Sequence, residues 1–83
     1  MNVIVTFDLD EHEAYEKGYD LFADLGLTRE GPHGETLPST TVMGNLDRKS
    51  ADEILAKINR KFEDAEICIT SIFVGVLQDW SVM

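Results

Sequence analysis

The spacing of apolar residues changes repeatedly along this chain, and these changes limit the folds that it can adopt. At the start, apolar and polar residues alternate, which is the two-residue period of a strand. Two later segments place apolar residues three and four positions apart, the period of a helix buried on one side. The predicted order is strand 2–9, helix 10–25, a weak strand before residue 31, strand 39–44, helix 50–62 and strand 66–77.

This order predicts an α/β fold of the α+β kind. Two helices cannot cover both faces of a four-stranded sheet, so we expect both on one face. The expected architecture is therefore a ferredoxin-like βαββαβ sandwich, with two helices on one face of a four-stranded antiparallel sheet. A chain of 83 residues has room for one hydrophobic core, so residues 1–83 are expected to form a single domain.

The sheet face without helices would carry Ile4, Thr6 and Asp8, together with every second residue of the last strand. This face is rather apolar for a surface open to water. We therefore expect a homodimer, formed through this face or through the C-terminal strand. Trp80 and Val82 keep the alternation of the last strand, which predicts either an extra strand or a segment that crosses to the partner subunit.

Local signals predict where the helices begin and end. Asp10 with Glu13, and Ser50 with Glu53, have the spacing of capping boxes, and Gly26 supplies a residue that ends a helix. In the last strand the apolar phase slips at residues 70–71, which predicts a bulge there or a strand covered on both faces.

The composition limits the function classes. Sixteen acids and seven bases give a net charge of −9, which disfavours binding of polyanions by charge alone. Three explanations account for the excess of acids: a solvated helix face, an acidic face that meets a basic partner protein or imitates nucleic acid, and a site for a divalent cation through which RNA is engaged. The longest apolar run, residues 72–77, is too short to cross a membrane, and the chain starts without a signal-peptide pattern, so we expect a cytoplasmic protein. The single cysteine, Cys68, cannot form an internal disulfide and is expected to be buried in the last strand.

The most specific motif is Phe7-Asp8-Leu9-Asp10 at the end of the first strand. By alternation Asp8 points away from the face that carries Phe7. An acid at this position, with a second acid two residues on, can hold a hard cation such as Mg²⁺. The alternative is that Asp8 only ends the strand and Asp10 only caps the helix. Tyr15 and Tyr19, one turn apart, are expected to pack in the fold rather than to stack on bases.

Several residues resemble those of a known group. The opening Met1-Asn2-Val3-Ile4-Val5-Thr6-Phe7-Asp8 is similar to that of VapD-type ribonucleases, GhoS-type antitoxins and the small CRISPR-associated proteins that work with the spacer integrase. With VapD the resemblance continues at Gly18-Tyr19, at Leu25-Gly26-Leu27-Thr28-Arg29 and at Asp79-Trp80, and in pattern it covers about two-thirds of the chain.

The resemblance implies a ferredoxin-like dimer of the defence or toxin–antitoxin type. It also implies a metal-dependent endoribonuclease in which Asp8 is both the catalytic residue and the Mg²⁺ ligand. Two Asp8 side chains meeting across the dimer axis would then hold one Mg²⁺ ion. The alternative is a non-catalytic, acidic interaction module that binds a basic partner protein.

Overall fold

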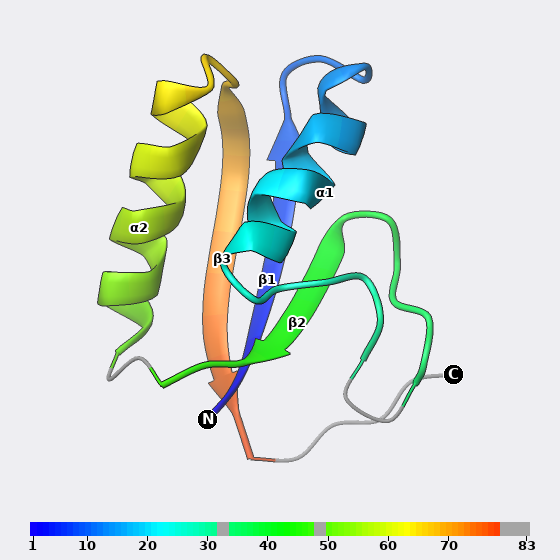
Figure 1. Cartoon of the computed structure of the whole chain (residues 1–83), viewed down its shortest axis with the longest axis vertical. Coiled ribbons are helices and arrows are strands. Elements are labelled where there is room, and N and C mark those ends of the chain that lie inside the picture. Colours follow the sequence, from blue (N-terminus) through cyan, green and yellow to red (C-terminus); the bar gives the residue numbers. More distant parts are fainter. Residues whose placement is uncertain (32–33, 48–49, 79–83) are drawn as a thin grey trace.

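The computed structural model describes residues 1–31, 34–47 and 50–78 of the chain. In this part the elements are β1 Asn2–Leu9, α1 Ala14–Asp24, β2 Thr41–Asn45, α2 Ala51–Asp64 and β3 Ile69–Leu77. The strands lie in the order β2-β1-β3, and both outer strands run antiparallel to β1. Both helices lie on the same face of this sheet (Figure 1). The predicted α+β arrangement is therefore confirmed for three strands and two helices.

The fourth strand predicted before residue 31 is not formed in the described residues. Two isolated bridges stand in its place. Glu30 pairs with Thr36, and Thr28 pairs with Met43, with which it exchanges two backbone N–H···O=C hydrogen bonds of 2.8 Å each. Few residues are available for a longer ladder, because Gly26 still belongs to the end of α1 and Gly31 already begins the loop tip. The predicted extra strand around Trp80 lies outside the described residues.

Two helix ends form as the sequence predicted. The hydroxyl oxygen of Ser50 accepts a hydrogen bond of 3.2 Å from the backbone N–H of Glu53, which satisfies one of the free donors at the start of α2. At the end of α1, Gly26 adopts a φ of 86°, and the Leu27 N–H donates to the Phe22 carbonyl at 2.9 Å. This is the left-handed helix ending that glycine makes at little steric cost.

The start of α1 differs from the prediction. The helix begins at Ala14, its N-cap residue is Glu13, and no side chain caps it, so the capping box of Asp10 with Glu13 is wrong. The Asp10 N–H instead donates to the carbonyl of Cys68 at 3.1 Å. This bond continues the strand pairing past the end of β1, so the chain turns into the helix several residues later than expected.

The predicted irregularity in the last strand is confirmed. Asp8 pairs with Ser71, but the next residue, Leu9, pairs with Ile69. Thr70 is therefore an extra residue on β3, which is the definition of a bulge. A bulge re-aims the side chains on either side of it, and this one lies beside Asp8.

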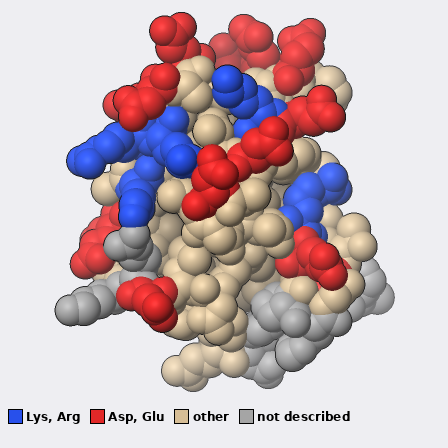
Figure 2. All heavy atoms as spheres, viewed as in Figure 1, with Lys and Arg blue, Asp and Glu red and all other residues tan. Residues whose placement is uncertain are grey.

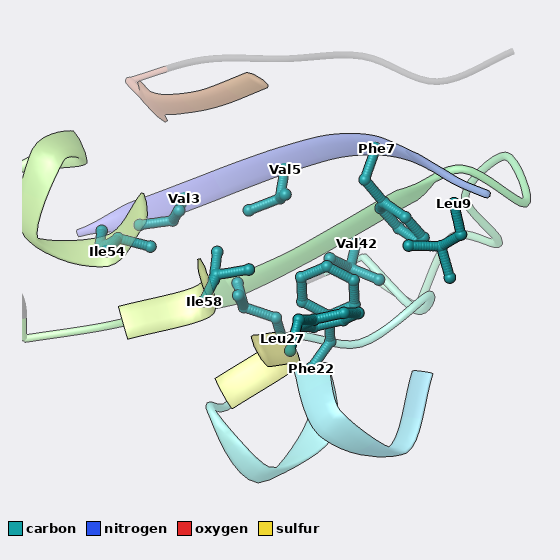
Figure 3. Packing of buried hydrophobic residues seen from close by; sticks show 10 residues of the cluster. Val3, Val5, Phe7, Leu9, Phe22, Leu27, Val42, Ile54 and Ile58 are labelled. Carbon is teal, nitrogen blue, oxygen red and sulfur yellow. The ribbon is translucent and has the colours of Figure 1, made fainter. Parts of the chain in front are cut away.

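The hydrophobic core lies between the sheet and the two helices. Alternate side chains of β1 point toward the helices (Figure 3). The core residues of the sheet and the helix layer are Val3, Val5, Phe7 and Leu9 from β1, Val42 from β2, Phe22 from α1, Leu27 after it, and Ile54, Ile58 and Phe62 from α2. Phe22 lies at the centre, with ring centroids 4.6 Å from Phe7 and 4.9 Å from Phe62. This packing occupies one face of the sheet and leaves the other without a helix.

Candidate functional site

Asp8 lies on the sheet face that has no helices. Its neighbours Phe7 and Leu9 are buried in the core, whereas Asp8 is exposed, as the two-residue period of a strand requires. The backbone carbonyl of Asp8 accepts a hydrogen bond of 3.1 Å from the hydroxyl of Thr70. The bulge in β3 therefore fixes the backbone at Asp8, while the carboxylate remains free to contact solvent or a ligand.

The chemical setting of Asp8 is sparse. It is the only charged residue in the three strands, and the side chain opposite it belongs to Ser71. Among the described residues, no group of three or more His, Cys, Asp or Glu side chains is placed to hold a metal ion. One carboxylate cannot supply the octahedral set of oxygen ligands that Mg²⁺ prefers. Any Mg²⁺ site at Asp8 would need water, substrate or a second copy of the chain to complete it.

Asp10, the second acid of the motif, has different surroundings. Together with Glu11, Glu66 and Cys68 it lines a hollow of about 220 Å³ near the start of α1, and Asp8 is not part of that wall. Cys68 itself is exposed and lies just before β3, so the prediction that it is buried in the strand is wrong. β1 ends at Leu9, so Asp10 lies beyond the strand that carries Asp8. Because Asp10 lines a hollow that does not include Asp8, the prediction that both acids hold one cation is not supported.

The face around Asp8 carries a strip of small and apolar residues, which we call the Phe73 strip. It consists of Ile4 and Thr6 on β1 and their cross-strand partners Gly75 and Phe73 on β3. Phe73 is 64% exposed, which is unusual for a phenylalanine in the middle of a strand. A Cβ atom on Gly75 would lie 3.2 Å from Cε1 of Phe73, so the phenylalanine ring rests over the glycine.

The Phe73 strip does not extend across the whole sheet. On the β2 side of the same face, Thr41 and Met43 are almost fully buried. The exposed surface is thus limited to β1 and β3. Sequence reasoning missed Phe73. Its position opposite Thr6 follows only once the bulge at Thr70 is placed correctly.

The charged side chains gather over the helices. Glu13, Glu16 and Asp20 line a shallow hollow on α1, beside Lys17 and Leu21. Figure 2, which views the helix side, shows acidic and basic side chains side by side there. The described bases are Lys17 on α1, Arg29 in the following loop, and Lys57, Arg60 and Lys61 on α2, while Arg48 and Lys49 lie outside the described residues.

Two of these charges have visible partners. The ammonium of Lys61 lies 3.6 Å from the carboxylate of Asp24, in an exposed ion pair that joins α2 to α1. The guanidinium of Arg29 lies over the ring of Tyr19, 5.0 Å from its centroid. Exposed pairs of this kind stabilise a fold only slightly. The described bases therefore lie on the helices and in the loop after α1, whereas Asp8 lies on β1.

The aromatic side chains of α1 contribute to the fold. Tyr15 and Tyr19 are half-buried and lie against Phe7, with ring centroids 5.9 Å and 6.3 Å away. The hydroxyl of Tyr15 accepts from the Leu9 N–H at 3.1 Å, and that of Tyr19 donates to the Ser39 carbonyl. The prediction that these tyrosines pack in the fold is confirmed.

No described helix is long and apolar enough to cross a membrane. No protein family model, curated protein or solved structure matches the chain. The resemblance to VapD-type ribonucleases and their relatives therefore stays a prediction.

Proposed function

We propose that the protein is a ferredoxin-like homodimer of the toxin–antitoxin or defence type, and that it is a metal-dependent endoribonuclease that uses Asp8. One observation carries this proposal. Asp8 is exposed on the helix-free face, where the same residue of a second copy can approach it. A carboxylate buried beneath the helices would have had no such access.

The ferredoxin-like assignment is supported by the position of Thr28. This residue lies along the free side of β2, where the remaining edge strand of a βαββαβ sandwich belongs. The bridge between Thr28 and Met43 is then the remnant of that strand. Two helices on one face agree with the same architecture.

The proposed chemistry needs two copies of the chain, because one Asp8 carboxylate cannot supply the ligands that Mg²⁺ prefers. Two Asp8 carboxylates from two copies would hold one Mg²⁺ ion, with water and an RNA phosphate as the remaining ligands. Mg²⁺ held in this way supplies Lewis-acid stabilisation of the phosphate and a more acidic water. The described bases lie on the helices and in the loop after α1, so the cation would also supply the positive charge that RNA binding needs.

The test compares the wild-type protein with Asp8→Asn on single-stranded RNA. We expect cleavage that depends on Mg²⁺ and stops with chelator, and a loss on the order of 100-fold in Asp8→Asn. Asp10→Asn is the matched control and should retain most of the activity, because Asp10 lines a hollow whose wall does not include Asp8. Equal residual cleavage in wild type and Asp8→Asn would remove Asp8 from the mechanism, and no Mg²⁺-dependent cleavage by the wild type would reject the enzyme.

A second candidate is an acidic interaction module that binds a basic protein. The observation in its favour is the acidic surface of α1, where Glu13, Glu16 and Asp20 gather beside a single base, Lys17. Such a surface attracts a basic partner over long range and gives binding that weakens as salt rises.

Charge reversal separates this module from the nuclease. In a pull-down from the source cells, we expect a partner that is lost when Glu13, Glu16 and Asp20 are replaced by Lys. Replacement of Glu63, Asp64 and Glu66 by Lys, at and just after the end of α2, is the control of equal charge change and should retain the partner. Equal loss in both variants would point to net charge alone, and retention in both would reject the α1 surface.

A further inference from the structure

The charge distribution limits what can bind the Phe73 strip. The chain carries a net charge of −9, so two copies repel each other over most approaches. Within the three strands, however, Asp8 is the only charged residue. On this surface a basic macromolecule could form an ion pair with Asp8 alone, and an acidic one would be repelled by it. A second copy presents the same nearly uncharged strip, so the strip is complementary to itself.

The shape of the strip suits a flat contact. The Phe73 ring rests over Gly75, where the absence of a Cβ atom lets it lie close to the sheet. Ile4 flanks the same glycine, since a Cβ there would lie 3.4 Å from its Cγ2 atom. The only large hydrophobic side chains of the described residues that are clearly exposed are Phe73 and Val76. Of these, Phe73 alone belongs to the strip, because Val76 pairs with the core residue Val3.

We propose that the partner of the Phe73 strip is a second copy of this chain. In this contact Phe73 is the anchor, and Asp8 is the residue that opposes association. A twofold contact uses the same surface on both subunits, so it brings two Phe73 rings and two Asp8 carboxylates into one interface. Burial of the aromatic rings favours association. Two like charges in a partly dehydrated interface disfavour it.

This inference deepens the proposed function, because it names the surface through which the dimer forms, and it rests on the dimer assumed there. It does not depend on RNA or on a metal. Without a cation Asp8 is expected to weaken the contact, whereas a cation held between two Asp8 carboxylates would offset the repulsion, so the contact is measured in chelator.

The test measures the dimer dissociation constant by sedimentation equilibrium in chelator. We expect Phe73→Ser to weaken dimerisation by about ten-fold or more, as removal of an aromatic anchor does. Asp8→Asn should strengthen it by several-fold, because it removes the repulsion. Val76→Ser is the matched control: it removes an exposed apolar side chain from the same strand but from the opposite face, and should leave the constant unchanged.

A further variant distinguishes this contact from pairing of β3 edges. Thr6→Glu places a charge in the strip on β1, which is the central strand and has no free edge. A contact between faces is weakened by this change, whereas edge pairing is not. The proposal is overturned if Thr6→Glu leaves dimerisation unchanged, if Asp8→Asn weakens it, or if the wild-type chain stays monomeric.

The outcome is separate from that of the nuclease test. Dimerisation that depends on Phe73, without RNA cleavage, rejects the enzyme and retains the interface. RNA cleavage by a protein whose assembly is insensitive to Phe73 and Thr6 rejects the interface and retains the enzyme. Asp8→Asn gives the sharpest contrast, since it should dimerise more tightly and cleave less.

Discussion

Gly44→Ala should unfold this protein or lower its free energy of unfolding by about 3 kcal/mol or more. A Cβ atom at this position would lie 1.9 Å from the carbonyl oxygen of Gly26 and 3.0 Å from its carbonyl carbon. Both are backbone atoms, which cannot move aside as a flexible side chain can. The Gly26 backbone is also fixed by its φ of 86° and by its N–H bond to the Ala23 carbonyl.

The measurement is urea denaturation followed by circular dichroism, combined with amide hydrogen exchange. If the chain avoids the clash by moving residues 26–28 away from β2, the Thr28 N–H should lose its protection before the core does. Gly75→Ala is the matched control, since its nearest atoms belong to the side chains of Phe73 and Ile4, which can adjust. A Gly44→Ala protein as stable as the wild type would show that the Gly26 backbone and β2 are not in this close contact.

The elements that the sequence predicted correctly are those fixed by neighbouring residues. Ser50 caps α2 because its partner, Glu53, is three residues away, and Gly26 ends α1 through its own φ angle. The bulge at Thr70 was visible as a slip in apolar alternation, because a strand with one face on a core must keep its phase. The orientation of Asp8 away from the core followed from the same two-residue period.

The features that the sequence could not give depend on contacts between distant residues. Asp10 and Glu13 have the spacing of a capping box, but the Asp10 N–H bonds to the Cys68 carbonyl, which lies 58 positions along the chain from it. The predicted fourth strand is reduced to isolated bridges at Thr28 and Glu30, because the end of α1 uses the preceding residues. Neither contact can be recognised from the spacing of residues that are close in the sequence.

Of the two main residues of the candidate site, the sequence predicted one and missed the other. Asp8 was found because it interrupts an apolar strand. Phe73 was missed because it lies in the continuous apolar run 72–77, which is the pattern of a buried strand. Its exposure depends on the absence of a helix over that face.

Phe22→Ala should remove about 3–5 kcal/mol from the free energy of unfolding. Phe22 is fully buried, and its ring lies between Phe7 of β1 and Phe62 of α2, so its loss opens a cavity where the sheet and both helices meet. A domain of this length has a total stability of about 4–12 kcal/mol. The substitution therefore removes a large share of it, and a fall in the urea midpoint with little change in slope is the expected result.

Phe73→Ala makes the same change on the other side of the sheet and is the matched control for Phe22→Ala. Phe73 is 64% exposed, so at protein concentrations where copies do not associate its removal should cost less than about 1 kcal/mol. Comparable losses for the two variants would contradict a free face over β1 and β3. A large loss for Phe22→Ala alone would show that β1 and β3 pack on the core with one face and leave the other free. That division is what leaves Asp8 and Phe73 available to a second copy.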